Sequence, residues 1–155
     1  MKGDTSMREI IFRGKRKGDG KWVEGYYVMV DPVDMPDRIR EPKAVIFPVY
    51  ATCNWFNKYF YNAVEVLPET VGQFTGLVDC YGKKIFEGDV LSITRGDVIK
   101  GVMYPNRSEI GVVEYCEGKF LMEIKHEYER REIMPLRYIE VIGNIHDDPE
   151  LLEAE

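Results

Sequence analysis

The chain has 155 residues, of which 45% are hydrophobic and 31% are charged, and its formal net charge is −6. This length suits one domain or two small units that bury roughly 70% of the unfolded surface, so neither a disulfide nor a metal is needed for folding. The acidity disfavours a general affinity for nucleic acid or anionic lipid. No apolar run approaches the roughly 20 residues of a membrane-spanning helix. We therefore expect a cytoplasmic protein with no membrane partner.

The first half of the chain predicts a β-hairpin. Residues 1–6 are polar, and we interpret them as an extension with Met7 as an alternative start. Residues 9–13 and 22–30 have the pattern of strands, and the glycine-rich residues 17–21 between them predict a tight turn. The proline-rich stretch that follows predicts a loop, over residues 31–42. Residues 44–50 predict a short strand that Pro48 places at an edge or interrupts.

The second half is punctuated by tight-turn glycines, Gly76, Gly82 and Gly88. Strands are expected at residues 90–94, 111–116, 119–125 and 138–145. The segment 94–107 contains Gly96, Gly101 and Pro105 and is predicted to be irregular. Residues 125–131 are charged and are predicted to be a solvated connection. Because closure removes exposed sheet edges, a small closed or half-closed SH3-like barrel suits these strands.

The carboxyl end predicts a short helical tail at residues 147–155. Asp148 would be the N-cap, Pro149 the first helical residue, and Glu150 would oppose the helix dipole. The predicted architecture is mainly β, with short antiparallel strands and minimal helix. An N-terminal hairpin region at residues 7–68 would pack on an SH3-like barrel region at residues 69–146.

Five segments, in the same order, are similar to the YopX family of bacteriophage and prophage proteins: residues 7–15, 22–28, 68–77, 82–90 and 139–152. The resemblance implies a small, mainly β protein of a Gram-positive host's cytoplasm, carried by a mobile element. It transfers no functional residue. The positions typical of the family in these segments each have a sufficient backbone reason to exist: Gly76, Gly82, Gly88, Asp89 and Gly143.

The one strongly basic segment is residues 8–21. Lys15, Arg16, Lys17 and Lys21 are candidate contacts for a nucleic-acid phosphate backbone, and Trp22 could stack on a base. The alternative is that these side chains only solvate the tip of the hairpin, as runs of charge usually do.

An aromatic cluster, residues 55–61, forms the second candidate surface. Trp55, Phe56, Tyr59 and Phe60 would anchor a protein partner or a second copy of the chain if they were exposed. The alternative is that most of these rings are core.

No metal or cofactor site is expected. His146 adjoins Asp147 and Asp148, but consecutive residues of an extended segment point in different directions, and capping accounts for Asp148. Cys53, Cys80 and Cys116 have no metal-ligand spacing, and we expect each to pack as a small apolar residue or to be a free thiol. No pair of acids can be assigned to general acid–base catalysis.

These patterns favour a non-enzymatic binding or assembly module of phage origin, with a homo-oligomer or a host or phage protein as partner. The first alternative is a nucleic-acid-associated phage factor that uses the basic hairpin. The second is an enzyme with a site between the two halves, for which a deep polar pocket would be the evidence.

Overall fold

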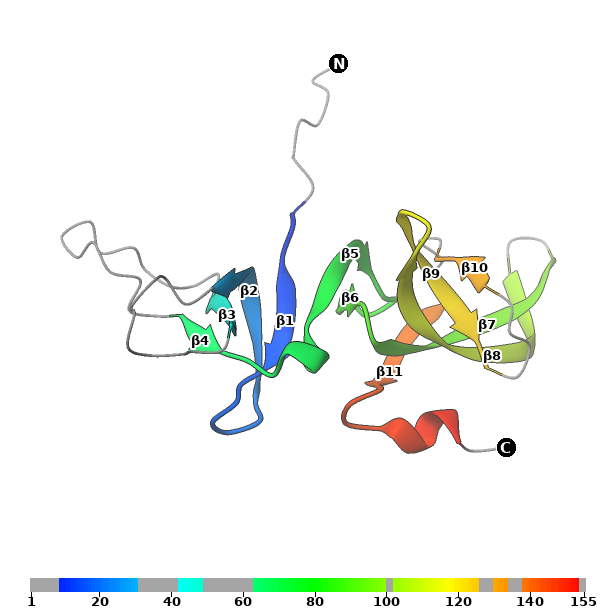
Figure 1. Ribbon diagram of the computed structural model, residues 1–155. Helices are drawn as coiled ribbons and strands as arrows, with labels where there is room; N and C mark the ends of the chain where they lie inside the picture. Colours follow the sequence, from blue (N-terminus) through cyan, green and yellow to red (C-terminus); the bar gives the residue numbers. More distant parts are fainter. Residues whose placement is uncertain are drawn as a thin grey trace, which may run out of the picture. The chain divides into compact units, whose positions relative to one another are not determined.

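The computed structural model describes residues 9–30, 42–48, 63–99, 102–125, 130–133 and 138–153. Within these ranges the chain is mainly β, as predicted, and two short 3₁₀ helices, η1 and η2, are the helical elements (Figure 1). The elements in chain order are β1 (Phe12–Lys15), β2 (Trp22–Val30), β3 (Lys43–Pro48), β4 (Val64–Glu65), η1 (Pro68–Thr70), β5 (Gly72–Val78), β6 (Lys84–Phe86), β7 (Asp89–Ile99), β8 (Val102–Cys116), β9 (Lys119–Ile124), β10 (Arg130–Glu132), β11 (Ile139–Asn144) and η2 (Pro149–Leu152).

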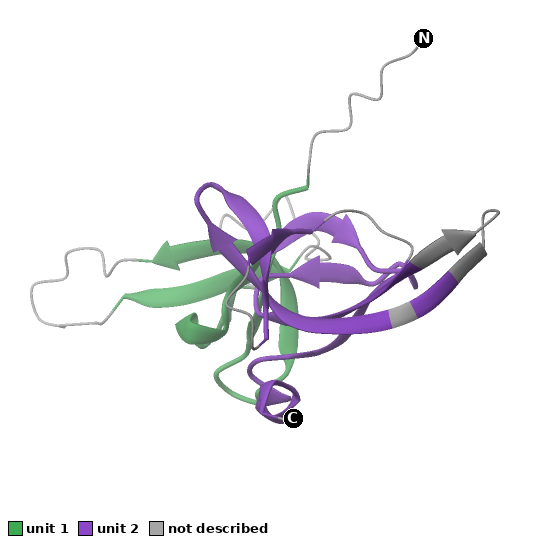
Figure 2. Ribbon diagram, turned by 90° about the vertical axis from the view of Figure 1, so that its right-hand side faces the viewer, with its two compact units in different colours: residues 1–73 green, residues 74–155 purple. Residues whose placement is uncertain are grey.

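The chain divides into two compact units, residues 1–73 and 74–155 (Figure 2). The sequence had placed the boundary between residues 68 and 69. In the structure, β5 contains it, since Gly72 and Gln73 belong to unit 1 and Phe74 begins unit 2.

Unit 1 is built on an antiparallel sheet in which the predicted hairpin is present. β1 pairs with β2, placing Lys15 opposite Trp22, and the remaining described strands extend the order to β4-β3-β2-β1-β5. Gly20 has a φ of 69° and supplies the left-handed residue of the β1–β2 turn. The buried residues Val23, Ala44, Ile46 and Val66 form the core on one face of this sheet. Pro48 is the last residue of β3, where a missing N–H is tolerated.

Unit 2 contains an antiparallel sheet with the strand order β10-β9-β8-β7-β11. β10 and β11 are its two ends, and no described residues pair them, so the described strands do not form a closed barrel. Of the closed or half-closed barrel that the sequence predicts, the closed form is therefore wrong. The core covers one face of the sheet and comprises Ile85, Leu91, Ile93, Val113, Met122, Ile124, Ile133, Ile139 and Val141. The second part of β5 pairs with β6 within the same unit.

The segment predicted to be irregular is instead a two-stranded ribbon. β7 and β8 stay paired from Val90 opposite Val112 out to Ile99 opposite Val102, and they extend away from the other strands of their sheet (Figures 1 and 2). The register shifts between Arg95 and Gly96, so one residue of β8 is bulged out. The bulge lies next to Gly96 and Pro105, two of the residues from which the sequence predicted an irregular segment.

Two smaller predictions are also corrected. The charged connection includes strand β10, which pairs Arg131 with Met122 of β9. The helical tail is a 3₁₀ turn that Pro149 begins, and Asp148 occupies the N-cap position without capping it through its side chain. Its carboxylate Oδ2 instead accepts a hydrogen bond of 3.2 Å from the backbone N–H of Asn144.

Candidate functional site

The tip of the basic hairpin is bound to an acidic neighbour. Lys17 Nζ and Lys43 Nζ each lie 2.8 Å from a carboxylate oxygen of Glu65, and Arg16 Nη1 lies 3.6 Å from Asp19 Oδ2. The two lysines donate hydrogen bonds to Glu65 and lower the pKa of its carboxyl from 4.5 to about 2. Glu65 therefore compensates part of the positive charge of Lys17 and Lys43 within the fold.

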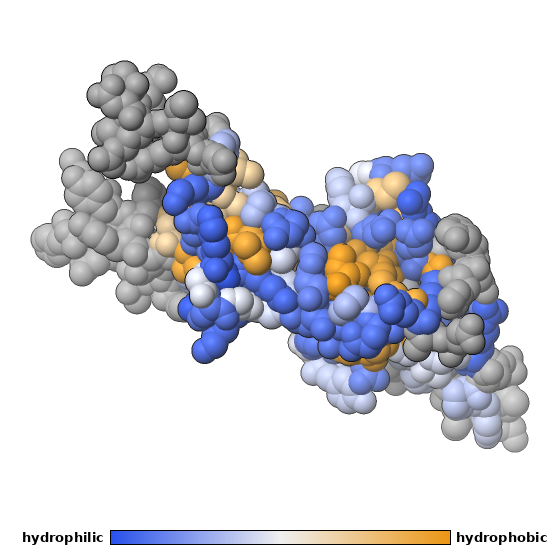
Figure 3. Space-filling model, turned by 60° about the horizontal axis from the view of Figure 1, so that its bottom comes forward, coloured by the Kyte–Doolittle hydropathy of each residue, from blue (hydrophilic) through white to orange (hydrophobic). Residues whose placement is uncertain are grey.

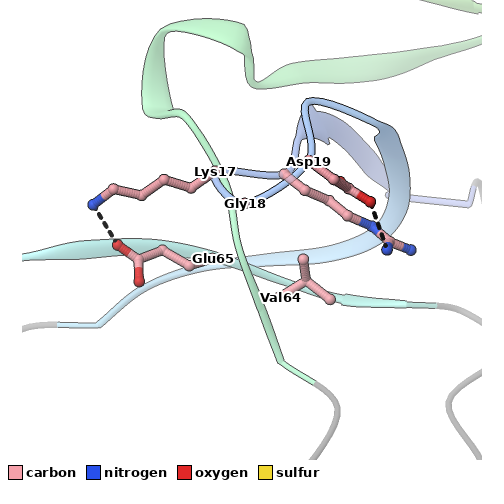
Figure 4. A pocket seen from close by; sticks show the side chains of 6 residues that line it. Lys17, Gly18, Asp19, Val64 and Glu65 are labelled. Atoms are coloured by element: carbon pink, nitrogen blue, oxygen red, sulfur yellow. Dashed lines mark hydrogen bonds and ion pairs between the residues drawn. The ribbon is translucent and has the colours of Figure 1, made fainter.

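These residues surround a shallow, open hollow (Figure 4). β4 supplies Val64 and Glu65, and the β1–β2 turn supplies the rest of its lining: Arg16, Lys17, Gly18 and Asp19. The close-up shows Glu65 reaching toward Lys17, while Asp19 turns toward the guanidinium beside it. The hollow thus has both charge signs at its rim and no concentrated cationic surface.

A second basic feature lies on the opposite side of β1 from the core. Lys15 Nζ is 5.5 Å and Arg13 Cζ is 4.7 Å from the ring centroid of Trp22, distances typical of cation–π contacts. The β1–β2 register places Lys15 opposite Trp22, which brings the three side chains to one face of the sheet. Sequence reasoning expected Trp22 to be near the basic residues, but it did not expect two cations over its ring.

The four predicted nucleic-acid contacts therefore have different surroundings. Lys15 lies against Trp22, Arg16 and Lys17 are in ion pairs, and Lys21 is exposed beside the turn. The structure brings them to one hairpin but does not test their binding, so this role stays a prediction. The aromatic candidates, Trp55, Phe56, Tyr59 and Phe60, lie outside the described residues.

Exposed apolar side chains occur in both units, among a surface that is mainly hydrophilic in Figure 3. The exposed run Val28, Met29 and Val30 ends β2 beside residues that the structure does not describe.

A buried glutamate at the root of the ribbon gathers three arginines. Glu109 of β8 is 4% exposed. Its Oε2 lies 2.7 Å from Arg131 Nη1 and 3.0 Å from Arg95 Nε, and its Oε1 lies 3.4 Å from Arg107 Nε. We call these four residues the arginine cluster. Sequence reasoning missed it, because the alternation of Arg107 and Glu109 is visible only if the segment is read as a strand.

The cluster lies on the core face of its sheet. Glu109 is opposite Ile93 and Arg107 is opposite Arg95 in the β7–β8 register, and residues opposite each other share a face. Arg131 is opposite Met122, another core residue, and so reaches the cluster from β10. The cluster therefore continues the apolar core of unit 2 into a charged end.

Asp79 is a buried carboxylate with a structural role. Its Oδ1 accepts hydrogen bonds from the backbone N–H groups of Tyr81 at 2.8 Å and Lys83 at 2.9 Å, and its Oδ2 accepts one of 3.2 Å from Val141 of β11. Burial alone would raise the pKa of Asp79, but the hydrogen bonds from Lys83, Val141 and Tyr81 outweigh burial and lower it. The neighbouring thiol is exposed, and desolvation with the charge of Asp79 raises the pKa of Cys80.

The acidic residues after β11 also hold the backbone. Asn144 Oδ1 accepts hydrogen bonds from the N–H groups of His146 at 2.9 Å and Asp147 at 3.0 Å, while Asp148 binds the N–H of Asn144. Among the described residues, no group of three histidine, cysteine, aspartate or glutamate side chains could hold a metal ion. In the same part of the chain, no helix is long and apolar enough to cross a membrane.

The family is decided by a match along nearly the whole chain. The model of the family described as YopX protein matches residues 11–153. The chain belongs to the YopX family. This confirms the resemblance drawn from the sequence. The YopX chain is also similar to a solved structure, the crystal structure of protein EF1440 from Enterococcus faecalis, with 21% identity and a TM-score of 0.49 over 94% of this chain and 99% of that chain. No curated protein matches the chain.

Proposed function

We propose that this YopX-family chain is a phage- or prophage-encoded binding or assembly protein, and that the β7–β8 ribbon is the arm with which it binds a protein partner. One observation carries the proposal: among the described residues, the ribbon continues for several residues beyond its neighbouring strands. Within these residues, β11 pairs with β7 as far as Ile93, and β9 pairs with β8 from Gly111 onward.

The outer edges of the ribbon are where a protein partner would bind. Thr94 and Ile110 still bond to the backbone of neighbouring segments, and beyond them β7 and β8 pair with each other in the described residues. A strand with a single partner presents backbone N–H and C=O groups on its other edge, which can add a strand from another chain. Such strand addition would suit either a second copy or a host or phage protein.

The test uses the full chain and a shortened variant as baits in induced host cells. The variant replaces residues 97–104 by Asn-Gly, a two-residue hairpin turn, and keeps the arginine cluster. We expect the full chain to retain a stoichiometric protein partner or a second copy, and the shortened chain to lose it while its circular dichroism is unchanged. Equal retention by both baits would contradict the role of the ribbon.

A second candidate is nucleic-acid binding by unit 1, favoured by the two cations at the ring of Trp22. Basic side chains interleaved with an aromatic ring are typical of surfaces that bind single strands. Against it stand the acidic net charge and the pairing of Lys17 with Glu65.

Fluorescence anisotropy with a labelled single-stranded oligonucleotide at low salt separates the two candidates. Binding by unit 1 predicts an affinity that falls steeply with salt and is lost in Lys15→Ala with Arg13→Ala. Lys83→Ala with Lys84→Ala removes the same charge from unit 2 and is the matched control. An absence of binding at low salt would remove this candidate.

A further inference from the structure

We infer that the outer edge of β7, and not that of β8, accepts one extended strand of a different protein. This inference rests on the proposed function of the ribbon, and it names the edge that binds and the kind of partner that fits. The difference between the two edges lies in their backbone, which the register and the hydrogen bonds of the described residues determine.

The outward backbone groups of β7 follow from the alternation of a strand. The N–H of Thr94 donates a hydrogen bond of 3.0 Å to the carbonyl oxygen of Tyr138, so Thr94 turns its backbone groups away from β8. Successive residues of an antiparallel strand alternate between its two sides, so Gly96 and Val98 also turn their N–H and C=O groups outward. Beyond Thr94, this edge has no strand partner among the described residues.

The outer edge of β8 is protected at the same level of the ribbon. Val102 is opposite Ile99 at the end of the ribbon, and the same alternation turns the backbone groups of Met103 and Pro105 outward. Proline has no N–H to donate, and the bulge beside Pro105 adds one residue to β8. Prolines and bulges are two devices by which edge strands avoid pairing with another chain. Neither device occurs in residues 95–99 of β7, so β7 presents the edge that a strand can extend.

Symmetric pairing with a second copy is disfavoured in each register of two β7 edges. A two-fold axis at Gly96 would place Val98 opposite Thr94, whose N–H is already bonded. An axis at Asp97 would place two aspartates directly opposite each other, and like charges in that position destabilise a strand pair. An axis at Val98 would leave one pair of hydrogen-bonding residues within the described part of β7. Two copies with a net charge of −6 also repel each other, so the strand belongs to a different protein.

Two proline variants separate the edges. Val98→Pro removes an outward N–H of β7 and Met103→Pro removes an outward N–H of β8, so neither change removes a hydrogen bond between the two strands. The wild type and both variants serve as full-length baits in induced host cells, and mass spectrometry identifies and quantifies the retained proteins. We expect Val98→Pro to retain about tenfold less of the partner, and Met103→Pro to retain it within about twofold of the wild type.

Amide hydrogen exchange tests the edge directly. In the free chain the Gly96 and Val98 amides should exchange rapidly, whereas the Asp97 amide, which points to β8, should be protected. In the purified complex the Gly96 and Val98 amides should exchange about tenfold more slowly or less, while the Met103 amide keeps its rate. Protection of the Asp97 amide also shows that the ribbon is intact in each variant. If Val98→Pro loses it, Val98→Lys with Met103→Lys replaces the proline pair, because lysine at an edge also opposes strand addition.

The outcomes distinguish this inference from the proposed function. If the chain shortened at residues 97–104 retains the partner, the ribbon is not the binding arm. If the shortened chain loses the partner but both proline variants keep it, or Met103→Pro alone loses it, the ribbon remains the binding arm and the role of the β7 edge is overturned. A second copy of the chain as the protein that Val98→Pro loses would overturn the assignment to a different protein.

Discussion

Replacing Asp79 by alanine tests a buried carboxylate that joins two segments of unit 2. Asp79 is 6% exposed and accepts three backbone hydrogen bonds, two from its own turn and one from Val141 of β11, 62 residues away. The change removes the acceptor of all three N–H groups at once. We therefore expect both the turn and its attachment to β11 to weaken.

The magnitude follows from where each donor lies. Water can replace the acceptor at the two N–H groups of the turn, so we assign about 1 kcal/mol to each of them. The N–H of Val141 belongs to a residue that is 8% exposed, and leaving it without an acceptor costs about 2 kcal/mol. The free energy of unfolding should fall by about 3–4 kcal/mol, a large share of the 5–15 kcal/mol of an ordinary domain.

Hydrogen exchange of the Val141 amide is the most direct assay. Both tryptophans precede residue 74, so tryptophan fluorescence in urea follows unit 1 and serves as an internal reference. We expect the protection of the Val141 amide to fall by two to three orders of magnitude in Asp79→Ala. Asp19→Ala, which removes an exposed turn acceptor for the Lys21 N–H, should cost less than about 1 kcal/mol.

The stability difference between the wild type and Asp79→Ala should depend on pH in one direction. The pKa of Asp79 is lowered from its ordinary value of 3.8, so the carboxylate stabilises the fold fully above that value and loses its effect as pH falls through the folded-state pKa. The difference between wild type and Asp79→Ala should therefore narrow from pH 7 to pH 3. A loss below about 1 kcal/mol at pH 7, or a difference that does not change with pH, would refute this account.

Three further predictions concern other parts of the chain. In Gly25→Ala the new Cβ would lie 1.9 Å from the carbonyl oxygen of Phe47, so the free energy of unfolding in urea should fall by more than about 2 kcal/mol. At Gly18 a new Cβ would have no atom within 4 Å, so Gly18→Ala should change the free energy of unfolding little. The Glu65 carboxyl should titrate by NMR near its pKa of about 2 at low salt, so its pairs with Lys17 and Lys43 stabilise the fold above pH 4.5 and lose this effect as pH falls toward 2. In 1 M salt the midpoint of the titration should move toward 4.5 because the ion pairs are screened, and an unmoved midpoint would argue against these ion pairs. Glu109→Gln leaves three arginines without their shared carboxylate and should lower the free energy of unfolding in urea by about 3–5 kcal/mol. A loss below about 1 kcal/mol would show that the arginines do not need this carboxylate.

The sequence predicted elements whose cause is local. The β1–β2 hairpin follows from two alternating runs and a turn in which Gly20 takes a positive φ, all within about twenty residues. The ribbon was missed because Gly96 and Pro105 argue against strands when each is considered alone. In the structure they face each other beside the bulge, where cross-strand pairing compensates for both.

The candidate sites depended on contacts between distant residues. Lys17 and Glu65 are separated by 48 positions, and Arg131 and Glu109 by 22, so no spacing rule connects them. A local reading could identify basic residues in the hairpin but not the acid that compensates them. It could not identify the arginine cluster at all, because three strands contribute to it.

Two glutamates, Glu65 and Glu109, each form ion pairs with more than one basic side chain. Glu65 is partly exposed, and the lysines that meet it are mostly exposed, so their pairing is screened by solvent and reduces the local charge of the hairpin tip. Glu109 is buried, and a buried carboxylate that lacked a cation would be costly, so it fixes the arginines around it. The charge runs of the sequence pointed to the hairpin, whereas the buried carboxylate that pairs with three arginines lies at the root of the ribbon.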